Sequence, residues 1–286
     1  MILRYDINKD FDTFIKTFNN YNNIYFLKFK QFINNENINK FSEVLKNNKS
    51  LIKLSLTNKQ RRTFYYNNVI NYVDHFDDYT NIINSLSINT NLTSLDLTNI
   101  NFKDKENGLT NSLIKSNSII KLNISDTHLS AENVSKLLSN CTNLTNLSIN
   151  DKYNNTIIND EFIKIISEPL KNNDTLQFLF LNCQKVKNIS PLTDALINNN
   201  SLHTLLLRHI VLVEQNDNVK EFIVSINLES IIKLIVNNKS INTLSIYNYL
   251  DNYLYGFSSC HTIKVSMYVD LIRQALEYNI SLTKLC

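Results

Sequence analysis

A repeat that recurs nine times is the feature of this sequence that most constrains its fold. Each copy centres on an apolar anchor residue, with leucine three positions after it and further apolar residues six and ten positions before it. In the first eight copies the residue five positions after the anchor is also apolar, although only 43% of the chain is hydrophobic. The anchors are Ile24, Leu51, Leu92, Ile119, Leu144, Leu176, Leu202, Ile241 and Leu282. An internal repeat of this kind predicts an architecture of stacked, similar units.

The spacing within one copy predicts a helix followed by a strand. The apolar residues ten and six positions before the anchor are four apart, so they share one face of a helix. The apolar residues three and five positions after the anchor alternate with other side chains, which is the period of a strand with one buried face. A single unit of this kind cannot bury its apolar face, whereas stacked units bury a continuous core. We therefore expect a parallel sheet with helices on one side.

The intervals between anchors vary, and the long ones predict insertions. These fall at about residues 58–80, 209–230 and 247–270, with a smaller one at 150–160. Residues 1–40 contain the most degenerate copy, and we expect them to form an N-terminal capping unit. About eight further units would then complete a single domain over residues 1–286.

Three residues indicate where individual helices begin or break. Ser130 and Ser190 each precede a helical pattern, and Ser190 is followed by proline, so both are expected to be N-caps. Pro169 lies inside a helical pattern, so we expect a break or kink near Glu168.

The repeat resembles leucine-rich repeats of the ribonuclease-inhibitor type. The clearest copy of the pattern consists of Leu192, Ala195, Leu196, Asn199, Leu202, Leu205 and Leu207. The resemblance extends over residues 14–285 and implies an α/β solenoid of horseshoe shape, with the parallel sheet on the concave face and helices on the convex face. It also implies a non-enzymatic protein-binding module, because members mostly bind proteins through the concave face and share no catalytic residue.

The sequence departs from that family in the loop after the strand. Such repeats usually place Asn or Cys there, in a ladder of buried side chains. The corresponding residues here are Lys59, Ile100, Thr127, Lys152, Gln184, Ile210 and Tyr249, so we expect irregular loops. The composition is rich in Asn, Ile, Lys, Tyr and Phe. In this it is similar to leucine-rich-repeat proteins of AT-rich large DNA viruses, such as insect poxviruses, or of protists.

The candidate binding site lies where the residues on the open face of the predicted sheet change from small or polar to large. Residues two, four and six positions after each anchor should face away from the helices, and in early copies they are small or polar. Later copies place larger residues there, namely Phe178, Phe180, Asn182, Leu206, Arg208 and Tyr247. Contiguous apolar side chains beside Arg and Tyr are typical of a binding hot spot, so we predict that a protein partner contacts these six. Alternatively, the apolar insertion at 209–230 folds over them.

Charge and motifs argue against most other functions. The net charge of +3 makes nucleic-acid binding a distant third possibility, through Lys28, Lys30, Lys53, Lys59, Arg61 and Arg62. The chain has only two glycines, so no glycine-rich phosphate loop can be written. Asp74, His75, Asp77 and Asp78 match no metal motif, and the four cysteines have no paired spacing. We therefore expect neither an enzyme nor a bound metal or cofactor.

The expected location is cytoplasmic, without membrane contact. The N-terminus lacks a signal peptide, and no run approaches the roughly 18 apolar residues of a membrane span. Two alternatives remain for the partner. In the first, the chain is either a substrate-recognition adaptor of a ubiquitin-ligase-type complex that docks through its N-terminal 40 residues, or a host-interaction factor. It also has a final strand that ends at Cys286, so association through an open C-terminal strand is an alternative.

Overall fold

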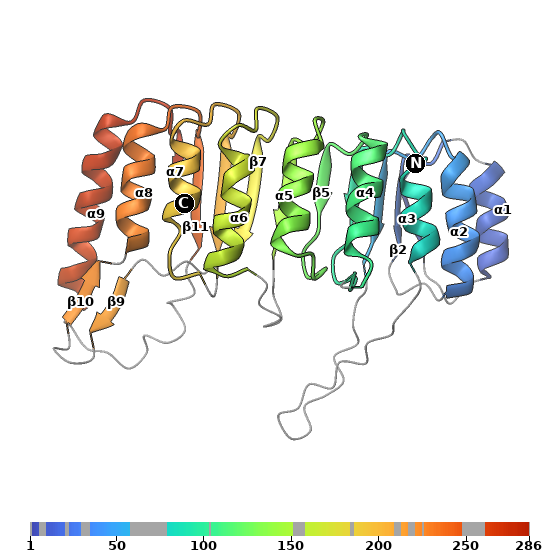
Figure 1. Cartoon of the computed structure of the whole chain (residues 1–286), viewed down its shortest axis with the longest axis horizontal. Helices are drawn as coiled ribbons and strands as arrows, with labels where there is room; N and C mark the ends of the chain where they lie inside the picture. The colour runs from blue at the N-terminus through green and yellow to red at the C-terminus, as the bar shows by residue number, and fades with distance from the viewer. Residues whose placement is uncertain are drawn as a thin grey trace, which may run out of the picture. The chain divides into compact units, whose positions relative to one another are not determined.

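The computed structural model describes residues 2–5, 10–20, 23–29, 35–57, 79–102, 104–150, 158–183, 186–208, 213–216, 221–224, 226–247 and 261–285. Contacts group the chain into two compact units, Met1–Leu129 and Ser130–Cys286. Each unit is built from the predicted helix–loop–strand repeat (Figure 1). The single domain over 1–286 and the capping role of residues 1–40 stay predictions.

The first unit contains four described helices on one face of a parallel sheet. The helices are α1 (Phe11–Asn20), α2 (Asn35–Asn47), α3 (Thr80–Leu86) and α4 (Glu106–Ser116). The strands are β1 (Ile2–Tyr5), β2 (Phe26–Phe29), β3 (Lys53–Leu56), β4 (Ser94–Asp96) and β5 (Lys121–Asn123). Each strand pairs in parallel with the next in the chain. This order is the expected consequence of consecutive stacked repeats.

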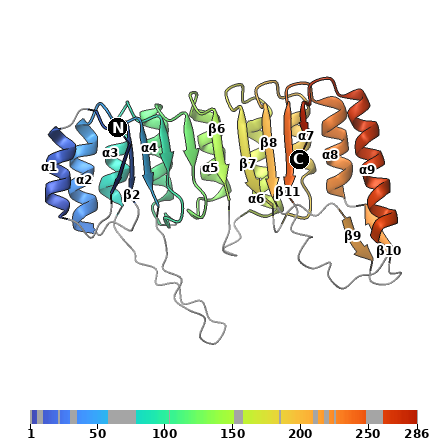
Figure 2. The ribbon, with the colours of Figure 1, turned by 180° about the vertical axis from the view of Figure 1, so that it is seen from behind.

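The second unit has the same organisation. Its described helices are α5 (Ala131–Asn140), α6 (Asp160–Leu170), α7 (Ser190–Ile197), α8 (Ile226–Asn237) and α9 (His261–Tyr278). Its sheet contains β6 (Asn146–Ile149), β7 (Phe178–Asn182), β8 (Thr204–Arg208), β11 (Thr243–Tyr247) and β12 (Lys284–Leu285), paired in that order and in parallel. A separate antiparallel hairpin, β9 (Val213–Asn216) and β10 (Glu221–Val224), lies between β8 and α8 in sequence. Figure 2 shows the strands from the side opposite the helices.

The repeat positions form the core, which confirms the leucine-rich-repeat fold class. The anchors of the first eight copies and the leucines three positions after them are all buried. At the start of the first unit, Phe14, Phe18, Phe29 and Phe41 pack with ring centroids 5.1 to 5.8 Å apart. In the last copy Leu285 is 38% exposed, because no further described repeat packs against it.

The local signals are partly confirmed. Ser130 is the N-cap of α5, and its side chain accepts a hydrogen bond from the Asn133 amide. The N-cap expected at Ser190 is wrong by one residue, because α7 begins at Ser190 and Ile189 precedes it. Helix α6 continues through Pro169 to Leu170, so the expected break near Glu168 is wrong.

A ladder of asparagine side chains stabilises the loops that lead from each helix into the next strand. It therefore precedes the strand, whereas the family that the repeat resembles places its ladder after the strand. Six copies have asparagine three positions before the anchor, and each side-chain oxygen accepts hydrogen bonds from the backbone amides of the anchor and the residue before it. These residues are Asn48, Asn89, Asn173, Asn199, Asn238 and Asn279. From Asn89 onward, each amide nitrogen donates to a carbonyl of the preceding copy. The ladder therefore links neighbouring repeats.

Candidate functional site

Strand register brings the predicted site residues together in the second unit. Phe178 pairs with Thr204, Phe180 with Leu206, and Asn182 with Arg208 across β7 and β8. Because side chains alternate along a strand, these residues lie on the face opposite the buried leucines of both strands. Phe180 and Leu206 are thus direct neighbours on adjacent strands.

The large side chains of this face are half-buried rather than fully open to solvent. Phe178, Phe180, Leu206 and Arg208 all have intermediate exposure. The sequence pattern indicates only which way a side chain points, whereas a neighbouring strand less than about 5 Å away covers its flanks. The solvent-facing prediction was therefore too strong, although each side chain keeps an accessible part.

Asn182 and Tyr247 need separate treatment. Asn182 is only 3% exposed, and its amide nitrogen donates to the Asn150 side-chain oxygen at 2.8 Å. Its predicted accessibility is therefore wrong: the strand register keeps it on the same face as Phe178 and Phe180, but it is buried there at the end of β7. The backbone of Tyr247 lies opposite Arg208 in β11, while its side chain lies outside the described residues.

The surroundings make the apolar pair distinct. Phe180 is flanked on β6 by Ser148, and Leu206 is flanked on β11 by Ser245. Arg208 is the one charged residue in β6, β7, β8 and β11. The face thus combines two adjacent apolar side chains, small polar neighbours and one guanidinium group. This combination suits contact with an apolar side chain and a carboxylate.

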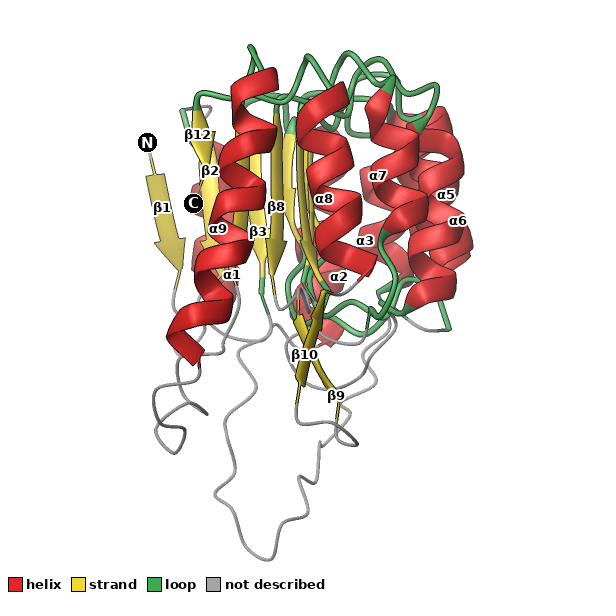
Figure 3. Cartoon of the chain, turned by 90° about the vertical axis from the view of Figure 1, so that its left-hand side faces the viewer, coloured by secondary structure: helices red, strands yellow, loops and turns green. Residues whose placement is uncertain are grey.

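The described part of the 209–230 insertion does not cover this face. It forms the β9–β10 hairpin, which lies beyond the ends of the strands, near the start of α8 (Figure 3). Residues 209–212, 217–220 and 225 lie outside the described residues. Covering of the site by this insertion therefore gains no support from the hairpin.

The other predicted sites are mostly beyond the described part of the chain. Of the basic residues considered for nucleic acid, Lys28 and Lys53 lie on adjacent strands, where Lys53 Nζ is 4.8 Å from the centroid of the Phe26 ring. The remaining residues lie outside the described ranges, namely Lys30, Lys59, Arg61, Arg62, Asp74, His75, Asp77 and Asp78.

The described residues include few groups suited to catalysis or to metal binding. Burial raises the pKa of the Cys141 thiol to about 11 and that of Cys183 to about 12, so both stay protonated at neutral pH. Within the described ranges, no group of three His, Cys, Asp or Glu residues is placed to hold a metal ion. Among the same residues, no helix has both the length and the apolar character to cross a membrane.

Comparisons with known proteins add no functional assignment. No known family matches the chain, and no curated protein matches it in sequence. The structure is similar to leiomodin-1 actin-binding site 2, with 20% identity over 67% of this chain and 90% of that chain and a TM-score of 0.35. It is also similar to a chain in the Rad7 and Elc1 complex from yeast, with 18% identity, 99% of this chain and 68% of that chain covered, and a TM-score of 0.47.

These likenesses do not extend to function. Both TM-scores are below 0.5 and both identities below 25%, so neither supports an inference about partner or activity. The comparisons give no support to the expected viral or protist origin. The fold assignment rests on the chain itself: its repeats are helix–loop–strand units with buried leucines and parallel strands, which is the leucine-rich-repeat fold.

Proposed function

We propose that this chain is a non-enzymatic module that binds a protein partner through the sheet face of its second unit. The contact centres on Phe178, Phe180, Leu206 and Arg208, and it includes Tyr247, whose backbone lies beside Arg208. The observation that carries the proposal is the direct pairing of Phe180 with Leu206 on a face that no described helix covers. Asn182 is buried, so it is not part of the proposed contact.

The backbone beneath the site favours binding. Strands β7 and β8 are each paired along both edges, so the side chains project from a backbone held on two sides. A pre-organised surface loses less conformational entropy when a partner binds. The half-buried aromatic rings are also already restricted by their neighbours, which lowers the ordering cost further. We therefore expect the partner to contribute an apolar side chain against Phe180 and Leu206, and a carboxylate near Arg208.

The test is a paired pull-down followed by reconstitution. Three baits are used: the wild-type protein, a face variant and a helix variant. The face variant carries Phe178→Ala, Phe180→Ala and Arg208→Glu. The helix variant carries Val236→Ala, Leu271→Ala and Arg273→Glu. The control residues are exposed in the same unit, and the changes are of the same kind.

A partner that binds wild type and the helix variant but not the face variant supports the proposal. That partner is then purified and its affinity for each bait is measured directly. Melting curves of all three baits must coincide, so that loss of binding is not loss of folding. If the purified partner binds the face variant as tightly as wild type, the proposed face is wrong.

The adaptor alternative, with docking through the N-terminal 40 residues, would need an exposed apolar helix face there. The apolar residues of α1 that are described as buried, Phe11, Phe14 and Phe18, pack into the core instead. The described residues of this segment therefore offer the alternative no exposed apolar helix face. We also propose an intracellular location, which the free thiols of Cys141 and Cys183 support.

A further inference from the structure

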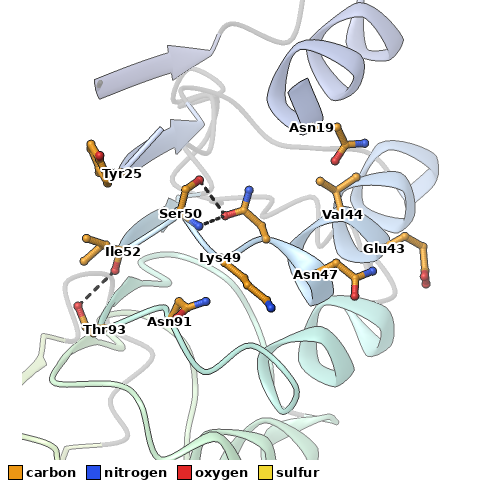
Figure 4. A pocket seen from close by; sticks show the side chains of 11 residues that line it. Asn19, Tyr25, Glu43, Val44, Asn47, Lys49, Ser50, Ile52, Asn91 and Thr93 are labelled. Carbon is orange, nitrogen blue, oxygen red and sulfur yellow. Dashed lines mark hydrogen bonds between the residues drawn. The ribbon is translucent and has the colours of Figure 1, made fainter. Parts of the chain in front are cut away.

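A hollow of about 870 Å³ opens over the helix-to-strand loops of the first unit. Figure 4 shows its two walls, one from the residues that lead into the strands and one from the ends of the helices. The strand wall consists of Tyr25, Ile52 and Thr93, and the helix wall includes Asn19, Val44 and Asn47. This hollow is separate from the proposed sheet face, which belongs to the second unit.

The strand wall presents large apolar side chains to solvent. Tyr25 is 51% exposed and Ile52 is 46% exposed. They are neighbours in adjacent repeats, because the Ile52 amide donates to the Tyr25 carbonyl at 3.0 Å. The Thr93 amide donates to the Ile52 carbonyl at 2.9 Å, which continues the row. Adjacent exposed apolar side chains at the rim of a hollow are typical of a contact surface.

One hydrogen-bond donor in the hollow lacks the acceptors that its counterparts have. In the next rung of the ladder, the Asn89 amide nitrogen donates to the carbonyls of Leu45 and Asn48, at 2.7 and 2.9 Å. The Asn48 side-chain oxygen is occupied by the Ser50 and Leu51 amides, as in every rung. Its amide nitrogen has no acceptor among the described residues, and Asn48 lines the hollow. In its counterparts this nitrogen donates to peptide carbonyl oxygens.

The charge of the hollow is positive. Lys49 lines it, is exposed and has no ion-pair partner within the described part of the chain. Lys53 is not part of the lining, because its Nζ lies 4.8 Å from the centroid of the Phe26 ring. The one acidic residue of the lining, Glu43, already pairs with Lys46 at 2.6 Å. An incoming negative charge would therefore meet Lys49, which no described acidic group neutralises.

We propose that this hollow binds an extended, acidic peptide segment of a protein partner. An apolar side chain of the segment lies on Tyr25 and Ile52, a backbone carbonyl accepts from the Asn48 amide, and an acidic side chain lies near Lys49. The apolar wall and the single-rung donor favour a peptide over a nucleic acid, which would need a longer row of cations. The inference does not depend on the function proposed for the second unit.

The experiment is a selection of peptides of about twelve residues, displayed on phage at random, against the immobilised full-length chain. Phages that bind the immobilising surface alone are removed. Enriched peptides are then synthesised with a fluorescent label, and their affinities are measured by anisotropy. We expect the enriched sequences to share a large apolar residue next to Asp or Glu.

Matched variants locate the binding. Ile52→Asp should weaken a selected peptide by roughly tenfold or more, and Lys49→Glu by roughly threefold to tenfold, more strongly at low salt. Ile88→Asp is the control, because Ile88 is 53% exposed in the same unit but does not line the hollow. It should leave the peptide affinity unchanged, and all variants should have the melting temperature of the wild-type protein.

Four results would overturn the proposal. The first is a selection without enrichment, and the second is enrichment without the acidic and apolar pair. The third is a labelled oligo-dT strand that binds more tightly than the selected peptides and loses affinity in Lys49→Glu, because it would assign the hollow to nucleic acid. A selected peptide that the Phe180→Ala variant loses, while Ile52→Asp keeps it, would place binding on the other unit.

Discussion

Replacing Asn199 with alanine should destabilise the second unit strongly. Asn199 is only 3% exposed, and its side-chain oxygen accepts from the Ser201 and Leu202 amides at 3.0 and 2.8 Å. Its amide nitrogen donates to the carbonyls of Leu170 and Asn173 at 2.9 and 2.8 Å. One side chain thus satisfies four backbone groups, two in its own loop and two in the preceding repeat.

The magnitude follows from those four bonds. Each intramolecular hydrogen bond contributes about 1 kcal/mol net, and a buried group left without a partner costs about 1 to 3 kcal/mol. The Asn173 carbonyl keeps a second donor, the Ser201 hydroxyl at 2.9 Å, which lowers the loss. We therefore expect Asn199→Ala to lower the free energy of unfolding by about 3 to 5 kcal/mol. For a unit of this size that corresponds to roughly 10 °C in Tm.

Two flanking asparagines supply the control. Asn198 and Asn200 are both exposed, so replacing either with alanine should change the free energy of unfolding by less than about 0.5 kcal/mol. Urea unfolding followed by circular dichroism measures all three variants, and amide exchange reports on the Leu202 amide directly. If Asn199→Ala lies within about 1 kcal/mol of Asn200→Ala, the ladder does not stabilise the fold as argued.

Three further outcomes test the same structure. Asn48→Asp keeps the accepting oxygen and loses only a donor without a described acceptor, so its melting curve should stay near wild type, whereas Asn89→Asp loses two bonds and should melt lower. Burial raises the pKa of the Cys183 thiol from the ordinary 9.0 to about 12. Between these two values the thiol ionises only in the unfolded state, so the free energy of unfolding should fall as pH rises from 9 toward 12. Urea unfolding at several pH values, with Cys183→Ala as the control, measures this. Leu205→Ala should cost about 2 to 5 kcal/mol because Leu205 is fully buried, whereas Leu206→Ala should cost clearly less, and equal losses in urea unfolding would contradict the assignment of faces.

The sequence predicted the ladder's residues but not their role. The asparagine three positions before six of the anchors can be read from the sequence, and this residue type favours hydrogen bonds to local backbone. The family that the repeat resembles places its ladder after the strand, where this chain has unrelated residues. The bonds that decide the matter join residues far apart in sequence, such as Asn89 to Leu45. No local pattern reports such a pairing.

The sequence predicted which way the side chains of the candidate site point, but not how accessible they are to solvent. The two-residue period of β7 separates Phe178 and Phe180 from the buried Leu179 and Leu181 without any structure. The same period places Asn182 on the open face, where the structure finds it buried against Asn150. The period fixes which way a side chain points, while a neighbouring loop of variable length decides what covers it.

The sequence by itself determined the repeat unit, the parallel order of the strands and the buried positions. It does so because helix and strand periods fix the faces of each element, and because an isolated unit cannot bury its apolar face. Only the tertiary structure decided which exposed-face residues stay accessible and that Tyr25, Ile52 and Thr93 line a common hollow. Those features depend on how residues from different repeats stack, and the spacing within one repeat carries no information about that.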